Sequence, residues 1–225
     1  MVISPPASES ELLDRARALS GMRLSDVAAS CGVPIPISPV KSKGWTGTLL
    51  ETALGATAAS LPEPDFQVIG VEMKTVPVST LGRPRESTYV CVVPMPGTAE
   101  PVWEQSNVRH KLARVLWMPV VCAANTRFSD RRIGAPLLWT PSKEEEAALR
   151  ADWEELMDMV CIGRIDEITA HQGTVLQIRP KAANAAARRR SVGRSGAPAE
   201  TLPRGFYLRP AFTGALFERY YAKIR

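Results

Sequence analysis

The residues from Pro64 to Lys74 constrain the fold more than any other part of this 225-residue chain. Apolar and other residues alternate from Val68 to Val76, and a period of two predicts a β-strand. Glu72 and Lys74 are two positions apart, so their side chains project from the same face of that strand. The opposite, buried face is formed by the intervening residues Ile69, Val71 and Met73.

Helical and extended patterns are interleaved along the rest of the chain. Two capping boxes predict helices over 8–20 and 142–162. Further helices are expected over 25–31, 46–59, 182–187 and 211–224, and further strands over 87–93, 111–121 and 206–208. A hairpin is expected over 165–179 and a mobile loop over 188–200. Interleaved elements of this kind predict a mixed α/β fold.

Composition excludes several classes of protein. No apolar run approaches the roughly 18 residues that a membrane span needs, and the N-terminus lacks the features of a secretory signal. The four cysteines are widely separated and include no C-x-x-C pair, so neither a zinc site nor a redox motif is supported. We expect a cytoplasmic protein that makes no contact with a membrane.

The charge is distributed unevenly. Residues 1–178 carry 17 Lys and Arg against 21 Asp and Glu, whereas residues 179–225 carry 11 against 2. Basic side chains release counterions from phosphates when they bind nucleic acid, so this segment favours a polyanionic partner. The alternative is a solvated basic tail.

Asp65, Glu72 and Lys74 form the pattern P-D-x₆-E-x-K. Two carboxylates and an ammonium group suit a Mg²⁺ site that hydrolyses phosphodiesters, because Mg²⁺ prefers oxygen ligands and lowers the pKa of bound water. Glu51 is a third candidate, since a carboxylate among leucines is costly unless it is paired or binds a metal. The alternatives are a strand edge with a Glu–Lys pair and an exposed helix position for Glu51.

Longer runs of the sequence resemble the MutH family, the strand-nicking endonucleases of methyl-directed DNA mismatch repair. The resemblance extends almost from end to end of the chain. It is carried by Lys43-Gly44-Trp45, Leu50-Glu51, Asp65 with Glu72-Met73-Lys74, Val108-Arg109-His110-Lys111-Leu112, Asp152-Trp153-Glu154-Glu155-Leu156, Ile178-Arg179-Pro180-Lys181 and Arg204-Gly205-Phe206-Tyr207-Leu208.

This resemblance implies a restriction-endonuclease-like core, with a mixed central β-sheet flanked by helices and two lobes that form a DNA cleft. The catalytic lobe is then expected over residues 1–110 and a basic DNA-reading segment over 179–225. The implied activity is Mg²⁺-dependent nicking of the unmethylated strand at hemimethylated GATC sites, in a monomer activated by MutL. Mn²⁺ and Ca²⁺ are further ions expected to fit the same site.

The resemblance also assigns roles to individual residues. Asp65 and Glu72 match metal-binding carboxylates, Lys74 matches the catalytic lysine, and Glu51 matches a helical carboxylate of the same site. Lys111 matches a basic residue near the catalytic centre. The residues implied to bind DNA are Lys43, Arg179, Lys181 and Tyr207, of which Tyr207 lies near the adenine whose methylation is sensed.

Two other functions remain open on the sequence. A stand-alone GATC restriction endonuclease would cut both strands of unmodified DNA and would gain nothing from MutL. A catalytically silent GATC-binding protein would need neither the carboxylates nor Lys74. The sequence contains no P-loop and no G-x-S-x-G motif, so neither ATP hydrolysis nor serine esterase chemistry is supported.

Overall fold

The computed structural model describes residues 3–37, 44–59, 61–94, 102–181, 187–192 and 197–222. The chain divides into two compact units, each built from separate stretches of sequence. The first unit contains residues 1–86, 114–140 and 214–225, and the second contains 87–113 and 141–213. This division differs from the continuous catalytic lobe expected over 1–110 and the basic segment over 179–225, because residues distant in sequence pair in both units.

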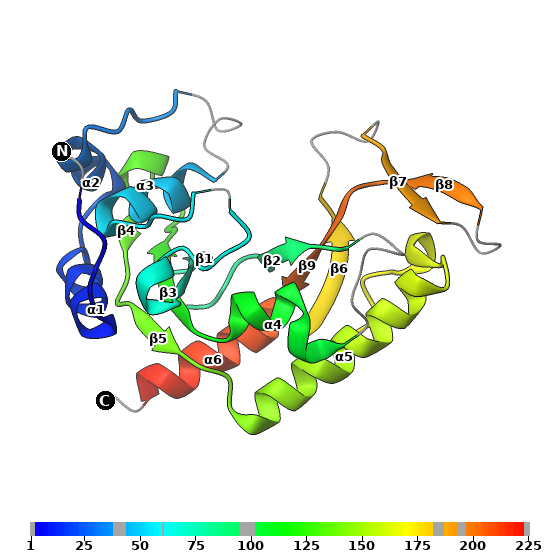
Figure 1. Cartoon of the computed structure of the whole chain (residues 1–225). Helices are drawn as coiled ribbons and strands as arrows, with labels where there is room; N and C mark the ends of the chain where they lie inside the picture. Colours follow the sequence, from blue (N-terminus) through cyan, green and yellow to red (C-terminus); the bar gives the residue numbers. More distant parts are fainter. Residues whose placement is uncertain are drawn as a thin grey trace. The chain divides into compact units, whose positions relative to one another are not determined.

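A mixed sheet forms the centre of the first unit (Figure 1). Strand β1 (Glu72–Val78) lies parallel to β3 (Val115–Val121), and the pairing runs in register along the full length of both strands. The short strands β4 (Arg132–Ile133) and β5 (Leu137–Trp139) pair antiparallel with β3. The sequence therefore predicted the fold class correctly, although it did not predict β4 and β5.

Three helices contribute to the core of this unit. They are α1 (Glu9–Ala18), α2 (Leu24–Cys31) and α3 (Trp45–Leu54). Their apolar stripes pack with the sheet in one cluster that includes Leu12, Val27, Leu50, Val71, Met73 and Leu116. On the surface, Arg114 donates from Nε to Glu9 Oε1 at 2.8 Å, and this hydrogen bond holds the pKa of Glu9 below its usual value.

Helix α3 ends earlier than the sequence predicted. We expected it to continue to residue 59, but it stops at Leu54 because Gly55 adopts a left-handed conformation with φ of 82°. A Cβ atom at residue 55 would lie 2.5 Å from the carbonyl oxygen of Ser4. The glycine therefore allows both the turn and the close approach of the N-terminal segment.

Strand β1 also begins later than predicted. We expected a strand from residue 68, but Gln67–Ile69 form a 3₁₀ turn and Gly70 is left-handed with φ of 65°. Phe66 and Val71 then pair as an isolated bridge before the strand begins at Glu72. Asp65 consequently lies before a turn, not on the strand that carries Glu72.

The second unit contains an antiparallel sheet in the order β2–β9–β6. These strands are β2 (Thr88–Val92), β9 (Arg204–Leu208) and β6 (Leu176–Pro180). The long helix α5 (Lys143–Cys161) packs against β6, and the short helix α4 (Asn107–Leu112) packs against β2. Helix α6 (Pro210–Ala222) follows β9 and continues into the first unit. Short 3₁₀ turns are formed by Trp103–Gln105 and Ile165–Glu167 in this unit and by Phe128–Asp130 in the first unit.

Three predictions of local structure in the second unit are wrong. Residues 165–179 do not form a hairpin, because β6 pairs with β9 and not with the preceding segment. Lys111 belongs to α4 and not to a strand. The stretch expected to be a mobile loop contains two paired strands, β7 (Arg189–Val192) and β8 (Pro198–Thr201). The predicted helix over 182–187 falls mainly on residues 182–186, outside the described part.

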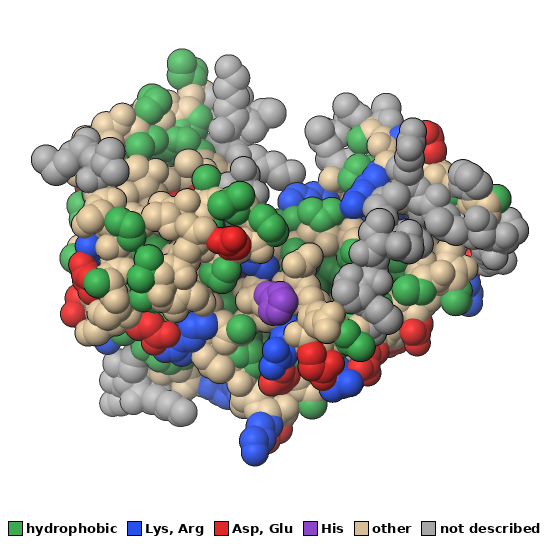
Figure 2. Space-filling model, in the orientation of Figure 1, with side chains coloured by type: hydrophobic (Ala, Val, Ile, Leu, Met, Phe, Trp, Pro, Cys, Tyr) green, Lys and Arg blue, Asp and Glu red, His purple; other side chains and the backbone are tan. Residues whose placement is uncertain are grey.

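The charged surface over α4 and α5 carries acidic and basic side chains next to each other (Figure 2). Arg109 pairs with Glu146 at 2.9 Å, and Arg150 pairs with Glu104 at 2.9 Å and Glu154 at 2.7 Å. All five side chains are about half exposed, so α5 presents a solvated charged face. None of the helices in the described residues combines the length and apolar character that crossing a lipid bilayer requires.

Asp152 fixes the start of β6 from the buried side of α5. Its carboxylate is only 4% exposed and accepts from the backbone N–H groups of Thr174, Val175 and Leu176 at 2.6–2.9 Å. Gly173 makes this turn possible, because a Cβ there would lie 2.0 Å from the carbonyl oxygen of Leu176. A buried carboxylate satisfied by three N–H groups is costly to alter.

We predict that Asp152→Asn lowers the free energy of unfolding by about 3 kcal/mol, because an amide cannot accept all these hydrogen bonds and turns a donor toward N–H groups. Urea denaturation of the full chain measures this change. The control is Asp158→Asn, which alters an exposed carboxylate on the same helix and should change stability by less than about 0.5 kcal/mol. Equal effects of the two substitutions would contradict the prediction.

Candidate active site and nucleic-acid interface

Glu72 and Lys74 form a buried ion pair at the start of β1. Lys74 Nζ lies 2.5 Å from Glu72 Oε1, and the side chains are 10% and 6% exposed respectively. The two residues project from one face of the strand, as their spacing predicted. The predicted burial of Val71 and Met73 is confirmed, whereas Ile69 is half-buried in the turn before the strand, and the two charged residues are buried as well. An ion pair removed from water in this way is expensive and favours a functional role.

The carboxylate of Asp65 reaches the same strand from the preceding turn. Its Oδ2 accepts from the backbone N–H of Met73 at 2.7 Å, and its carbonyl oxygen accepts from the N–H of Thr57 at 2.9 Å. β1 is an edge strand, and Met73 lies between Glu72 and Lys74. Asp65 therefore satisfies a backbone donor at the edge and is held next to the ion pair.

Glu51 lies on α3, the helix that packs closest to β1. It is partly buried, between the fully buried Leu49 and Leu50 on one side and Leu54 on the other. The carbonyl oxygen of Glu51 accepts from the N–H groups of Gly55 and Ala56, and this fixes the end of the helix. The exposed helix position weighed as an alternative for Glu51 is wrong, because the residue is partly buried.

The donor set of these three carboxylates fits a hard divalent cation, because Mg²⁺ takes oxygen ligands. Within the described residues, no three His, Cys, Asp or Glu side chains are gathered closely enough to hold a metal ion. Glu72 is turned toward Lys74 and Asp65 toward the N–H of Met73. Glu51, Asp65 and Glu72 thus remain the predicted ligands.

Two further predicted residues, Lys111 and Lys43, are not among those that the first unit brings together. Lys111 is on α4 in the second unit, separate from the unit that holds the carboxylates. Lys43 falls outside the described residues, immediately before Gly44, whose left-handed backbone precedes α3. The structure therefore brings Asp65, Glu72 and Lys74 together and leaves the part played by Lys111 and Lys43 a prediction.

Two of the predicted DNA-binding residues share one face of the second sheet. Gln177 pairs with Tyr207 and Arg179 pairs with Gly205 across β6 and β9, so these side chains project to the same side. Tyr89 pairs with Tyr207 from β2, and their rings meet edge to face with centroids 5.4 Å apart. We call the surface formed by Ser87, Tyr89, Gln177, Arg179, Lys181 and Tyr207 the reading face.

Lys181, the third predicted residue, lies against Tyr89. Its Nζ is 3.3 Å from the centroid of the Tyr89 ring, which places the cation over the aromatic face. Gly205 makes room for this ring, because a Cβ there would lie 2.9 Å from Tyr89 Cε2. Neither Tyr89 nor Ser87 was selected from the sequence, since their contacts depend on pairing between segments more than 80 residues apart. Their only signal was their spacing of two in a predicted strand.

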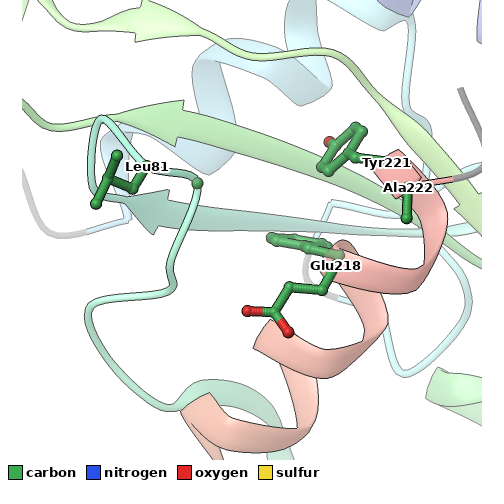
Figure 3. Close-up of a pocket in the computed structure, with 6 residues that line it drawn as sticks. Leu81, Glu218, Tyr221 and Ala222 are labelled. Carbon is green, nitrogen blue, oxygen red and sulfur yellow. The ribbon is translucent and has the colours of Figure 1, made fainter. Parts of the chain in front are cut away.

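A separate pocket of about 410 Å³ lies between the turn after β1 and helix α6 (Figure 3). Leu81, Glu218, Tyr221 and Ala222 line it, together with Gly82 and Phe217. Burial raises the pKa of Tyr221 to about 12, and its hydroxyl donates to the carbonyl oxygen of Ala135 at 2.7 Å. None of the residues predicted to bind metal or DNA lines this pocket.

Comparison with known proteins identifies the family. The family model described as DNA mismatch repair enzyme MutH matches residues 54–152, which include Asp65, Glu72 and Lys74. A protein of Salmonella typhimurium named DNA mismatch repair protein MutH is 54% identical over 220 residues, covering 98% of this chain and 95% of that protein. The chain belongs to the MutH family.

Two other members of the family show similar sequence identity to this chain. The MutH proteins of Salmonella newport and Salmonella paratyphi C are 54% and 53% identical over the same 220 residues. Membership places the chain among DNA mismatch repair enzymes, and the mixed α/β architecture is consistent with the restriction-endonuclease-like core expected of MutH proteins. The resemblance inferred from the sequence runs is confirmed.

We predict that Lys74→Met lowers the free energy of unfolding by about 3 kcal/mol, because it leaves the buried Glu72 carboxylate without its cation. Urea denaturation at neutral pH without divalent ions measures the change. Arg17→Met is the matched control, since it breaks a pair with Asp14 whose side chains are 59% and 67% exposed. That control should cost less than about 1 kcal/mol. A Lys74 variant as stable as the control would argue against a stabilising buried pair.

Proposed function

We propose that this MutH-family protein is a Mg²⁺-dependent endonuclease that nicks the unmethylated strand of hemimethylated GATC sites and is activated by MutL. The observation that carries the proposal is the buried Glu72–Lys74 pair on β1, with the Asp65 carboxylate held against the intervening residue. A protein that only bound DNA would not need to bury two charges on a core strand. Membership of the MutH family supports the mismatch repair context.

In this mechanism, Glu51, Asp65 and Glu72 would hold the divalent ion, which would supply Lewis acid chemistry at the scissile phosphate and would lower the pKa of bound water. The Lys74 ammonium group orients the attacking water by hydrogen bonding and stabilises negative charge that develops on the phosphate. The strand β1 fixes both side chains before DNA binds, because their backbone is paired with β3 along its length. The products are a 5′-phosphate and a 3′-hydroxyl.

The reading face supplies the sequence preference. Arg179 is exposed and forms no ion pair with a carboxylate among the described residues, so its guanidinium can donate to the O6 and N7 atoms of guanine. Tyr207 is partly exposed beside it. An aromatic ring packed against the edge of adenine clashes with an added N6-methyl group, which would direct the cut to the unmethylated strand.

The test is nicking of a plasmid with a single hemimethylated GATC site, in Mg²⁺, with and without MutL and ATP. We expect nicks confined to the unmethylated strand, stimulated by MutL and abolished in Lys74→Ala. Linear product from unmethylated plasmid, with no effect of MutL, would instead favour the stand-alone restriction endonuclease. Specific binding to GATC without cleavage would favour the catalytically silent GATC-binding protein.

Metal binding can be tested without activity. Calorimetric titration with Mg²⁺ alone should give a saturable heat with the wild-type chain that is lost in Glu72→Gln and Asp65→Asn. The control is Asp14→Asn, which removes an exposed carboxylate of α1 in the same unit. Because Asp65 also caps the N–H of Met73, thermal unfolding of each variant must be measured beside the titration. Undiminished Mg²⁺ binding by a folded Glu72→Gln protein would remove Glu72 from the ligand set.

A further inference from the structure

Ser87 lies immediately before β2 and contacts two side chains of the edge strand β6 on the reading face. Its Oγ accepts a hydrogen bond from Nη1 of Arg179 at 3.0 Å and another from Nε2 of Gln177 at 2.9 Å. Gln177 is 4% exposed, whereas Arg179 is exposed. A single hydroxyl thus joins a buried amide to an exposed guanidinium.

These contacts restrict a side chain that would otherwise move freely. An exposed arginine loses rotamer entropy when a partner orders its side chain. The buried Gln177 fixes the position of the hydroxyl, and the hydroxyl then fixes one nitrogen of Arg179. Both acceptor sites of Ser87 Oγ are engaged, so the hydrogen bond to Arg179 is in place before any ligand binds.

We propose that Ser87 is a positioning residue that orients the Arg179 guanidinium for base recognition, with Gln177 holding Ser87 in place. The inference rests on the proposed function, because it assumes that Arg179 reads DNA. Ser87 acts through Arg179 and is not itself in contact with the scissile group. Ordering the guanidinium in advance lowers the entropy cost of forming a bidentate contact, so loss of the hydroxyl weakens discrimination between bases.

Ser87 and Lys181 are expected to contribute differently to DNA binding, although both lie on the reading face. Lys181 Nζ lies over the ring of Tyr89, whereas the Ser87 hydroxyl accepts from Gln177 and Arg179, so we expect the contribution of Lys181 to binding to be independent of that hydroxyl. A lysine that contacts phosphates affects all sequences alike and sets the salt dependence of binding. Removal of the Ser87 hydroxyl should therefore change sequence preference and leave the salt dependence unchanged.

The experiment measures binding of the full chain to two labelled duplexes by fluorescence anisotropy. One duplex contains a single GATC, and in the other both G·C pairs of that site are replaced by A·T pairs. The ratio of the two dissociation constants gives the preference. The variants are Ser87→Ala and the pair Ser87→Thr and Ser87→Val, which have the same shape but differ in the hydroxyl.

We expect Ser87→Ala and Ser87→Val to reduce the preference about three- to tenfold, and Ser87→Thr to retain it. Arg179→Ala should abolish the preference, and adding Ser87→Ala to Arg179→Ala should cause no further loss. This double-mutant cycle distinguishes positioning from a general loss of stability, because a merely structural defect would persist without Arg179. Thermal unfolding of each variant accompanies the binding measurements.

Three results would overturn the inference. The first is an unchanged preference in Ser87→Val when Arg179→Ala loses it. The second is that Arg179→Ala lowers the affinity for both duplexes equally, which would make Arg179 a phosphate contact. The third is an equal effect of Ser87→Ala with and without Arg179. A wild-type chain with no preference for GATC would instead refute the proposed function, so the two failures are distinguishable.

Discussion

The parallel pairing of β1 with β3 is the constraint on which the other features of this chain depend. Parallel strands cannot be joined by a tight turn, so the chain must leave the first sheet after β1 and return before β3. The excursion from residue 79 to 114 contains β2 and α4, which belong to the second unit. One topological requirement thus places Glu72 and Lys74 on a buried strand and sends the following residues into the sheet that carries the reading face.

How far the sequence predicts this arrangement depends on the range of the interactions. The helix after Ser8 and the helix after Ser142 were predicted well, because their capping residues are local and Ser8 and Ser142 both accept the expected N–H bond. The pair formed by Glu72 and Lys74 was also predicted, since a spacing of two on a strand is a local property. Pairing between strands distant in the sequence was not predicted. The hairpin predicted over 165–179 is wrong for that reason, because β6 pairs with β9.

Two of the boundaries that were predicted wrongly follow from glycines. Gly55 and Gly70 both adopt left-handed conformations, and each begins or ends an element within a run of apolar residues that otherwise predicts continuation. The alternation around Gly70 suggested that Asp65 precedes the strand directly. The turn at 67–69 instead folds Asp65 back onto Met73, which brings a carboxylate to the ion pair by a hydrogen bond that periodicity does not reveal.

The interleaving of the two units has a consequence for any attempt to dissect the protein genetically. The backbone passes from one unit to the other after residues 86, 113, 140 and 213. No single truncation therefore removes one unit and leaves the other whole, and a fragment that keeps Asp65, Glu72 and Lys74 but stops before residue 114 lacks the partner strand of β1. Recombination between relatives would be expected to preserve both units together, so that the residues of the ion pair and those of the reading face are inherited as one block.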